Sequence, residues 1–167
     1  MDSYQVDMYL NTSVVALYPD IKQIVTQDDE QWQYGKLLLA TGGHPRQLPG
    51  MPEGLIYYRN RADYAHLREL VDTRENFCII GGGFIGSELA AAINQQGKRV
   101  TMIFPEIGIS GLVFPDDLSK FVSQYYVDRG IDILAGQLVS SITASDDQYV
   151  VRMKNIHTDE EQSRIFD

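Results

Sequence analysis

Three glycines between a short apolar run and an amphipathic stretch have the spacing of a phosphate-binding turn. Gly81, Gly83 and Gly86 follow the apolar residues 77–80 and open the stretch 84–96. In such a turn the first glycine lets the chain bend sharply, the second lets the backbone approach a pyrophosphate, and the third lets the helix lie close to the strand. The free N–H groups of the first helical turn would then face the phosphates. The pattern predicts a dinucleotide-binding βαβ unit.

An acidic residue after the second expected strand indicates which dinucleotide this unit would bind. Glu106 lies 20 residues after Gly86. At this offset a carboxylate accepts hydrogen bonds from the ribose hydroxyls of NAD, and its charge would repel the additional phosphate of NADP. No arginine stands in its place, because the strand ends in Phe104-Pro105-Glu106. We therefore expect NAD(H) to be the ligand.

A second acidic residue, Glu88, lies two positions after Gly86 among largely apolar neighbours. Two interpretations remain open from the residues alone. An acid in the first turn of a helix complements the positive end of the helix dipole. The same carboxylate could instead be a functional group of the nucleotide site.

The elements around the glycine turn are expected to form an α/β fold. Apolar spacing predicts helices over 62–73, 84–96 and 115–128, and Gly97 is suited to end the second of them. Strands are expected over 77–80, 100–104, 131–134, 138–143, 149–154 and 163–166, with a hairpin turn at 145–147. The result would be a Rossmann-like, three-layer NAD-binding domain with a parallel central sheet.

The residues before the glycine turn read as a small β-meander. Strands are expected over 6–10, 13–18 and 22–26, and the continuous apolar run 37–40 predicts a strand covered on both faces. The glycine- and proline-rich residues 41–54 predict a loop at a domain boundary, followed by a short strand over 55–58.

Composition excludes several other classes of function. The formal charge of −9 argues against a nucleic-acid partner, and no apolar run approaches the ~20 residues of a membrane-spanning helix. Neither a G-x-S-x-G nucleophile elbow nor a G-x-x-x-x-G-K-[ST] phosphate loop occurs. Three scattered histidines predict no metal site, and the one cysteine, Cys78, is expected to be a buried small apolar residue that cannot form a disulfide within the chain.

Two segments in order resemble a known family. Ala40-Thr41-Gly42-Gly43, followed by Ile80 to Ala90 with its own glycine turn, resembles the FAD-dependent pyridine nucleotide-disulfide oxidoreductase superfamily, and within it the flavoproteins of the apoptosis-inducing-factor type. The resemblance implies that NADH passes hydride to flavin. It also implies roles for site residues. The pyrophosphate would lie at Gly81, Gly82, Gly83, Phe84, Ile85 and Gly86, and Phe84 and Glu88 would lie near the nicotinamide, with Glu88 as the catalytic candidate. Phe104 and Glu106 would bind the nucleotide, with Glu106 at the adenine ribose, and Thr41 and Gly42 would lie along FAD.

The resemblance also divides the chain and names its partners. Residues 1–50 would be part of an FAD domain, and residues 51–167 an NAD(H)-binding domain truncated at its C-terminal end. Because the family's FAD fingerprint is absent, we expect a fragment that is inactive alone. Its partners would be the dinucleotide, the remaining FAD domain, an unknown electron acceptor and a second copy of the chain. The compartment would be the cytoplasm by default, or the mitochondrion by resemblance. The alternative is a non-catalytic redox-sensor or interaction module that binds a nucleotide.

Overall fold

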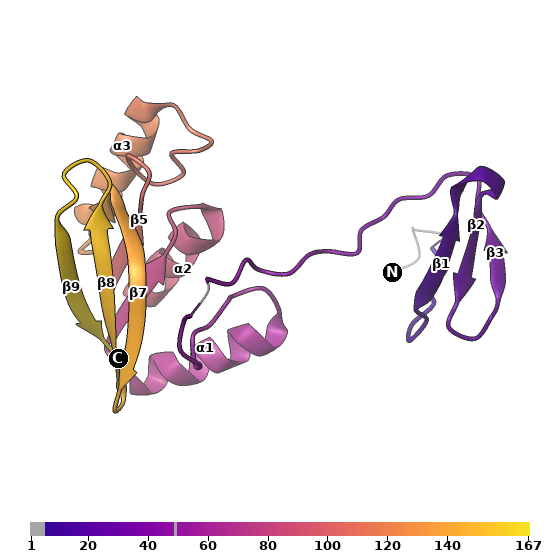
Figure 1. Cartoon of the computed structure of the whole chain (residues 1–167), viewed down its shortest axis with the longest axis horizontal. Coiled ribbons are helices and arrows are strands. Elements are labelled where there is room, and N and C mark those ends of the chain that lie inside the picture. The colour runs from indigo at the N-terminus through magenta and orange to yellow at the C-terminus, as the bar shows by residue number, and fades with distance from the viewer. Residues whose placement is uncertain (1–5, 49) are drawn as a thin grey trace. The chain divides into compact units, whose positions relative to one another are not determined.

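Two units, which meet in sequence at Gly43 and His44, make up the chain in a computed structural model that describes residues 6–48 and 50–167 (Figure 1). The second unit runs from His44 to Asp167. The boundary expected from the sequence lies nearby, at residue 50. That the first unit is part of an FAD domain stays a prediction.

The first unit is built on a three-stranded antiparallel sheet in the order β1 (Val14–Tyr18), β2 (Gln23–Thr26), β3 (Gln31–Gln33). A short 3₁₀ turn, Pro19–Ile21, joins the first two strands. The sheet has little interior, because Thr26 is the only buried residue among residues 6–43. The expected meander over 13–26 is confirmed, and β3 is a strand that the sequence analysis did not predict.

Three of the expected strands are wrong. Residues 6–10, 37–40 and 55–58 have no strand structure. The run 37–40 was expected to be covered on both faces, yet Leu38 is 89% exposed and Leu39 is 65% exposed. An apolar run forms a strand only where a neighbouring strand completes its hydrogen bonds, and none of the described residues does so for these segments.

The second unit has a parallel sheet at its centre, as predicted. Its order is β4 (Asn76–Ile80), β5 (Arg99–Phe104), β6 (Asp132–Ala135), and the helix α2 (Phe84–Asn94) connects the first two strands. The helix α3 (Asp116–Val127) connects β5 to β6, and α1 (Arg61–Thr73) precedes β4. The expected end of α2 at residue 96 is two residues too long, and Gly97 follows with a φ of +80°.

The central strand β5 is buried on both of its faces. Met102 and Phe104 pack in a cluster with α1, α2 and the segment after β5, whereas Ile103 packs against the opposite layer. That layer is an antiparallel sheet of β7 (Gln137–Ser145), β8 (Gln148–Asn155) and β9 (Glu161–Phe166) (Figure 1). The expected hairpin is confirmed, because Ser145 pairs with Gln148 around a two-residue turn. The three-layer fold is therefore confirmed, with helices on one face of the parallel sheet and strands on the other.

Candidate dinucleotide-binding site

The glycine turn between β4 and α2 needs glycine at three positions, 81, 82 and 86, for reasons internal to the protein. Gly81 has a φ of +113°, which side chains disfavour, and its N–H donates to the carbonyl oxygen of Ile103 at 2.9 Å. A Cβ on Gly86 would lie 2.3 Å from the carbonyl oxygen of Gly81. Gly83 differs, because a Cβ there would meet no atom within 4 Å. Glycine at position 83 therefore leaves open space at the surface of the turn, where a ligand can approach the backbone.

Gly82 is held over the aromatic ring of Phe104. A Cβ on Gly82 would lie 2.8 Å from two ring carbons of Phe104. Phe104 is 1% exposed and belongs to the core on the helix side of the sheet. Its ring packs against the turn at Gly82, and Phe104 is not among the residues that line the cavity beside the turn. The direct contact of Phe104 with the nucleotide stays a prediction. Its burial and its absence from the cavity lining do not favour such a contact.

The N-terminus of α2 has no side-chain cap, as is also true of α3. The N-cap residue of α2 is Gly83. By contrast, Asn60 caps α1, with its side chain accepting from Ala62 N at 2.7 Å and from Asp63 N at 3.2 Å. Uncapped N–H groups and the positive end of the helix dipole together favour a phosphate.

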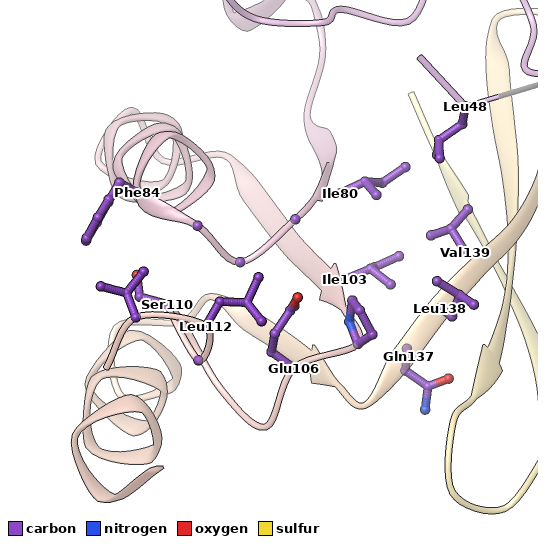
Figure 2. A pocket seen from close by; sticks show the side chains of 16 residues that line it. Leu48, Ile80, Phe84, Ile103, Glu106, Ser110, Leu112, Gln137, Leu138 and Val139 are labelled. Carbon is purple, nitrogen blue, oxygen red and sulfur yellow. The ribbon is translucent and has the colours of Figure 1, made fainter. Parts of the chain in front are cut away.

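A cavity of about 320 Å³ opens beside the glycine turn (Figure 2). It lies at the carboxyl ends of β4 and β5, which is where ligands bind in open parallel sheets. Most of its lining is apolar, and Glu106 is the one charged residue among the described lining residues. The lining residues are Leu48, Ile80, Gly81, Gly82, Gly83, Phe84, Ile103, Pro105, Glu106, Ser110, Gly111, Leu112, Val113, Gln137, Leu138 and Val139.

Glu106 is half-buried, and in Figure 2 its carboxylate is directed toward the glycine turn. Its backbone is fixed by the N–H of Gly136, which donates to its carbonyl oxygen at 3.1 Å. A Cβ on Gly111 would lie 3.0 Å from the Cβ of Glu106, so the following loop passes close to it. The structure thus brings the predicted ribose-binding carboxylate and the predicted phosphate turn to one cavity.

The other predicted site residues are divided between the cavity and its surroundings. Phe84 lines the cavity, is 54% exposed and packs against Phe114 with ring centroids 5.8 Å apart. Ile85 and Glu88 are exposed and lie outside the lining. Their places beside a bound nucleotide stay predictions. Thr41 and Gly42 are exposed residues of the first unit, and their predicted role along FAD also stays a prediction.

Sequence reasoning missed the loop after β5 and the start of β7 as parts of the cavity. Ser110 to Val113 and Gln137 to Val139 line it, together with Leu48 and Pro105. Both segments follow the carboxyl ends of parallel strands, β5 and β6. The rule that ligands bind at this edge of a parallel sheet would have identified them before the structure was known.

The sequence predicted that Cys78 is a buried small apolar residue. It is partly buried and packs against the core between the parallel sheet and β7–β9. Burial raises the pKa of its thiol from 9.0 to about 12, although the positive charge of Arg164 opposes the shift. The protonated thiol is therefore the dominant form at neutral pH. Among the described residues, no group of three or more His, Cys, Asp or Glu side chains could hold a metal ion, and no helix is long and apolar enough to cross a membrane.

Comparison with known proteins gives relatives whose whole length exceeds that of this chain. It is 36% identical over 137 residues to mitochondrial apoptosis-inducing factor 1 of Dictyostelium discoideum, covering 77% of this chain and 26% of that protein. The structure of a water-forming NADH oxidase from Lactobacillus brevis, bound to NADH, superposes with a TM-score of 0.67 at 27% identity. That match covers 91% of this chain and 35% of the oxidase. An engineered NADPH oxidase made from the same enzyme, bound to NADPH, superposes with a TM-score of 0.65 at 28% identity and covers 86% of this chain and 34% of that one.

A family model described as pyridine nucleotide-disulphide oxidoreductase matches residues 2–166, nearly the whole chain. The predicted superfamily is thereby confirmed, and NAD(H) and FAD are its cofactors. The chain itself spans about a quarter to a third of the length of the relatives described above. On this match, the chain belongs to the pyridine nucleotide-disulphide oxidoreductase family.

Proposed function

We propose that the second unit binds NAD(H), with a preference for NADH over NADPH, as the dinucleotide-binding part of an FAD-dependent oxidoreductase. The observation that carries the proposal is the shared cavity of the open glycine turn and Glu106. In the whole protein, hydride would pass from the nicotinamide to flavin, a reaction whose chemistry the two cofactors supply. The first unit would contribute to the FAD domain of that protein.

The residues of the cavity suit the parts of this dinucleotide. The pyrophosphate would lie over Gly83 and accept hydrogen bonds from the uncapped N–H groups at the start of α2. Glu106 would accept hydrogen bonds from the ribose hydroxyls of the adenosine half. The chain's own contribution is to bind and orient the nucleotide. Phe84 lines the same cavity, and its side chain would contact the nicotinamide half of the nucleotide.

The charge of the lining supports NADH over NADPH. A 2′-phosphate needs a basic partner, and the described lining residues include no lysine, arginine or histidine. Glu106 would in addition repel the phosphate electrostatically. One solved relative is a water-forming NADH oxidase bound to NADH, and an engineered variant of that relative with five substitutions is an NADPH oxidase bound to NADPH.

Isothermal titration calorimetry of the chain with NADH and with NADPH tests the proposal. We expect NADH to bind about tenfold or more tightly than NADPH. With NADPH, the 2′-hydroxyl that would donate to Glu106 is replaced by a phosphate, whose negative charge meets that of the carboxylate. Glu106→Gln should weaken the binding of NADH and narrow the difference in affinity between NADH and NADPH. Glu69→Gln, which removes the same charge from an exposed residue of α1, serves as the control. No binding of NADH, or tighter binding of NADPH, would contradict the proposal.

A further inference from the structure

Two serines of α3 satisfy both backbone groups of a single residue in the loop that follows β5. Ser119 Oγ donates to the carbonyl oxygen of Ile109 at 2.8 Å, and Ser123 Oγ accepts from the N–H of Ile109 at 2.8 Å. Ser123 Oγ also donates to the carbonyl oxygen of Ser119 at 2.9 Å. Ser119 is completely buried and Ile109 is 1% exposed. Loss of either hydroxyl would leave a buried backbone group of Ile109 without its partner, which is costly.

The residue after Ile109 connects this loop to the glycine turn. The N–H of Ser110 donates to the carbonyl oxygen of Gly82 at 2.7 Å. Glu106 and Gly111 stand at the two ends of the same loop, close to one another. A continuous set of contacts therefore runs from α3, through Ile109 and Ser110, to both the phosphate turn and the ribose-binding carboxylate.

The loop is seated against α3 without spare room. A Cβ on Gly108 would lie 2.7 Å from the carbonyl oxygen and the Oγ of Ser119, and 2.8 Å from Ser123 Oγ. Since the carbonyl oxygen belongs to the backbone of α3, a side chain at position 108 would have to push the loop away from the helix. The position of the loop is thus set by α3, whose serines face it.

We propose that Ser119 and Ser123 are positioning residues of the dinucleotide site, because together they hold the loop that sets Glu106 relative to the glycine turn. The inference rests on the proposed binding of NAD(H) and deepens it. Neither serine lines the cavity, so each would act through Ile109 and not by touching the nucleotide. The effect of removing them should appear at the adenosine half of the ligand, where Glu106 lies.

Calorimetry on matched serine variants tests this role. Ser119→Ala and Ser123→Ala should each weaken NADH by about tenfold, the size of coupling expected within a shared hydrogen-bond network. Ser123→Thr keeps the hydroxyl and should restore an affinity within about twofold of the unmodified chain. Ser163→Ala, at an exposed position of β9, is the control and should leave the affinity unchanged. ADP-ribose, which lacks the nicotinamide, should lose as much affinity as NADH.

A double-mutant cycle separates positioning from general destabilisation. If the serines act by placing Glu106, then Ser123→Ala in a Glu106→Gln background should cost less than about twofold in affinity, because the carboxylate it places is already gone. The same fold-loss in both backgrounds would overturn the proposal. Unchanged NADH affinity in Ser119→Ala and Ser123→Ala, with binding intact in the unmodified chain, would also overturn it.

Hydrogen exchange measured without nucleotide keeps this inference distinct from the proposed function. In Ser119→Ala the peptide covering residues 106–111 should exchange faster, while the strands β7–β9 keep their protection. Faster exchange throughout the second unit would mean a loss of global stability and would overturn the positioning role. Failure of the unmodified chain to bind NADH would instead overturn the proposed function, and the exchange result would still decide whether the serines hold the loop.

Discussion

The two units of this chain both contain hydrogen-bonded sheets but differ in how many apolar side chains they bury. The second unit has two clusters of buried apolar residues, one on each face of the sheet β4–β5–β6. The first unit has an antiparallel sheet, with a register shift in β1 between Val14 and Ala16, and buries Thr26 alone among its described residues. Its strands expose apolar side chains, including Val14 at 55% and Val15 at 63%. Both units therefore have hydrogen-bonded sheets, whereas the clusters of buried apolar side chains lie in the second unit alone among the described residues.

The difference matters for where a function can be located in this chain. A three-stranded sheet without a packed face is marginally stable in water, so we expect the first unit to be less stable than the second. The cavity with the glycine turn and Glu106 lies wholly within the second unit, which has its own core. Nucleotide binding can thus be tested on this chain through its second unit.

The largest expected effect is a separation of two unfolding transitions. Trp32 is the one tryptophan of the chain and lies in β3, so its fluorescence reports on the first unit, while far-UV circular dichroism reports mainly on the second. During urea unfolding we expect the fluorescence change to occur at a lower concentration than the dichroism change. A stability of about 5 kcal/mol or more is typical of a domain with a core, compared with almost none for an unsupported small sheet. Coincident transitions would contradict the comparison, because they would mean that the two units unfold together.

The same contrast explains what could be predicted from the sequence. The βαβ unit was predicted to within about two residues at each end, because the glycine turn and the alternation of helix and strand patterns agree with the contacts that form. The run 37–40 was wrongly predicted to be a strand. Its apolar composition suits a segment that is covered on both faces, and none of the described residues covers it. Composition indicates that a segment is suited to burial, but the partner that buries it is a property of tertiary structure.

The candidate site, like the fold, could be predicted from the sequence only in part. Gly81, Gly83 and Glu106 have chemistry that depends on spacing along the chain, and the structure brings them to one cavity. Ser119 and Ser123 have no such signature, because two serines four residues apart on a helix usually face solvent or their own backbone. Their importance follows from the close approach of the loop at Gly108, which is a fact of packing. The cavity lining from β7 likewise required the topology of the sheet.

An intermediate effect is expected from truncating one side chain in each unit. Met102→Ala removes a completely buried side chain from β5 and should lower the free energy of unfolding by about 2–5 kcal/mol. Val15→Ala, at a 63% exposed position of β1, should change it by less than about 0.5 kcal/mol. Urea denaturation measures both changes, followed by circular dichroism for Met102→Ala and by the fluorescence of Trp32 for Val15→Ala. A cost for Val15→Ala close to that for Met102→Ala would show that the first sheet is packed in solution, and would remove the contrast between the units.

The smallest expected effect sharpens the comparison at single glycines, because the added group is one methyl. Gly86→Ala places a Cβ 2.3 Å from the carbonyl oxygen of Gly81, and since backbone atoms cannot swing aside, α2 must move away from the turn. We expect a loss of about 1–3 kcal/mol in stability, the usual cost of overpacking, together with weaker NADH binding. Gly35→Ala in the first unit meets no atom within 4 Å, so it should leave stability and binding unchanged. Thermal unfolding and calorimetry on the two variants measure these effects. Unchanged stability and binding in Gly86→Ala would mean that the turn has more room than the close approach of Gly86 to Gly81 implies, and that packing does not fix the alignment of α2 with the glycine turn.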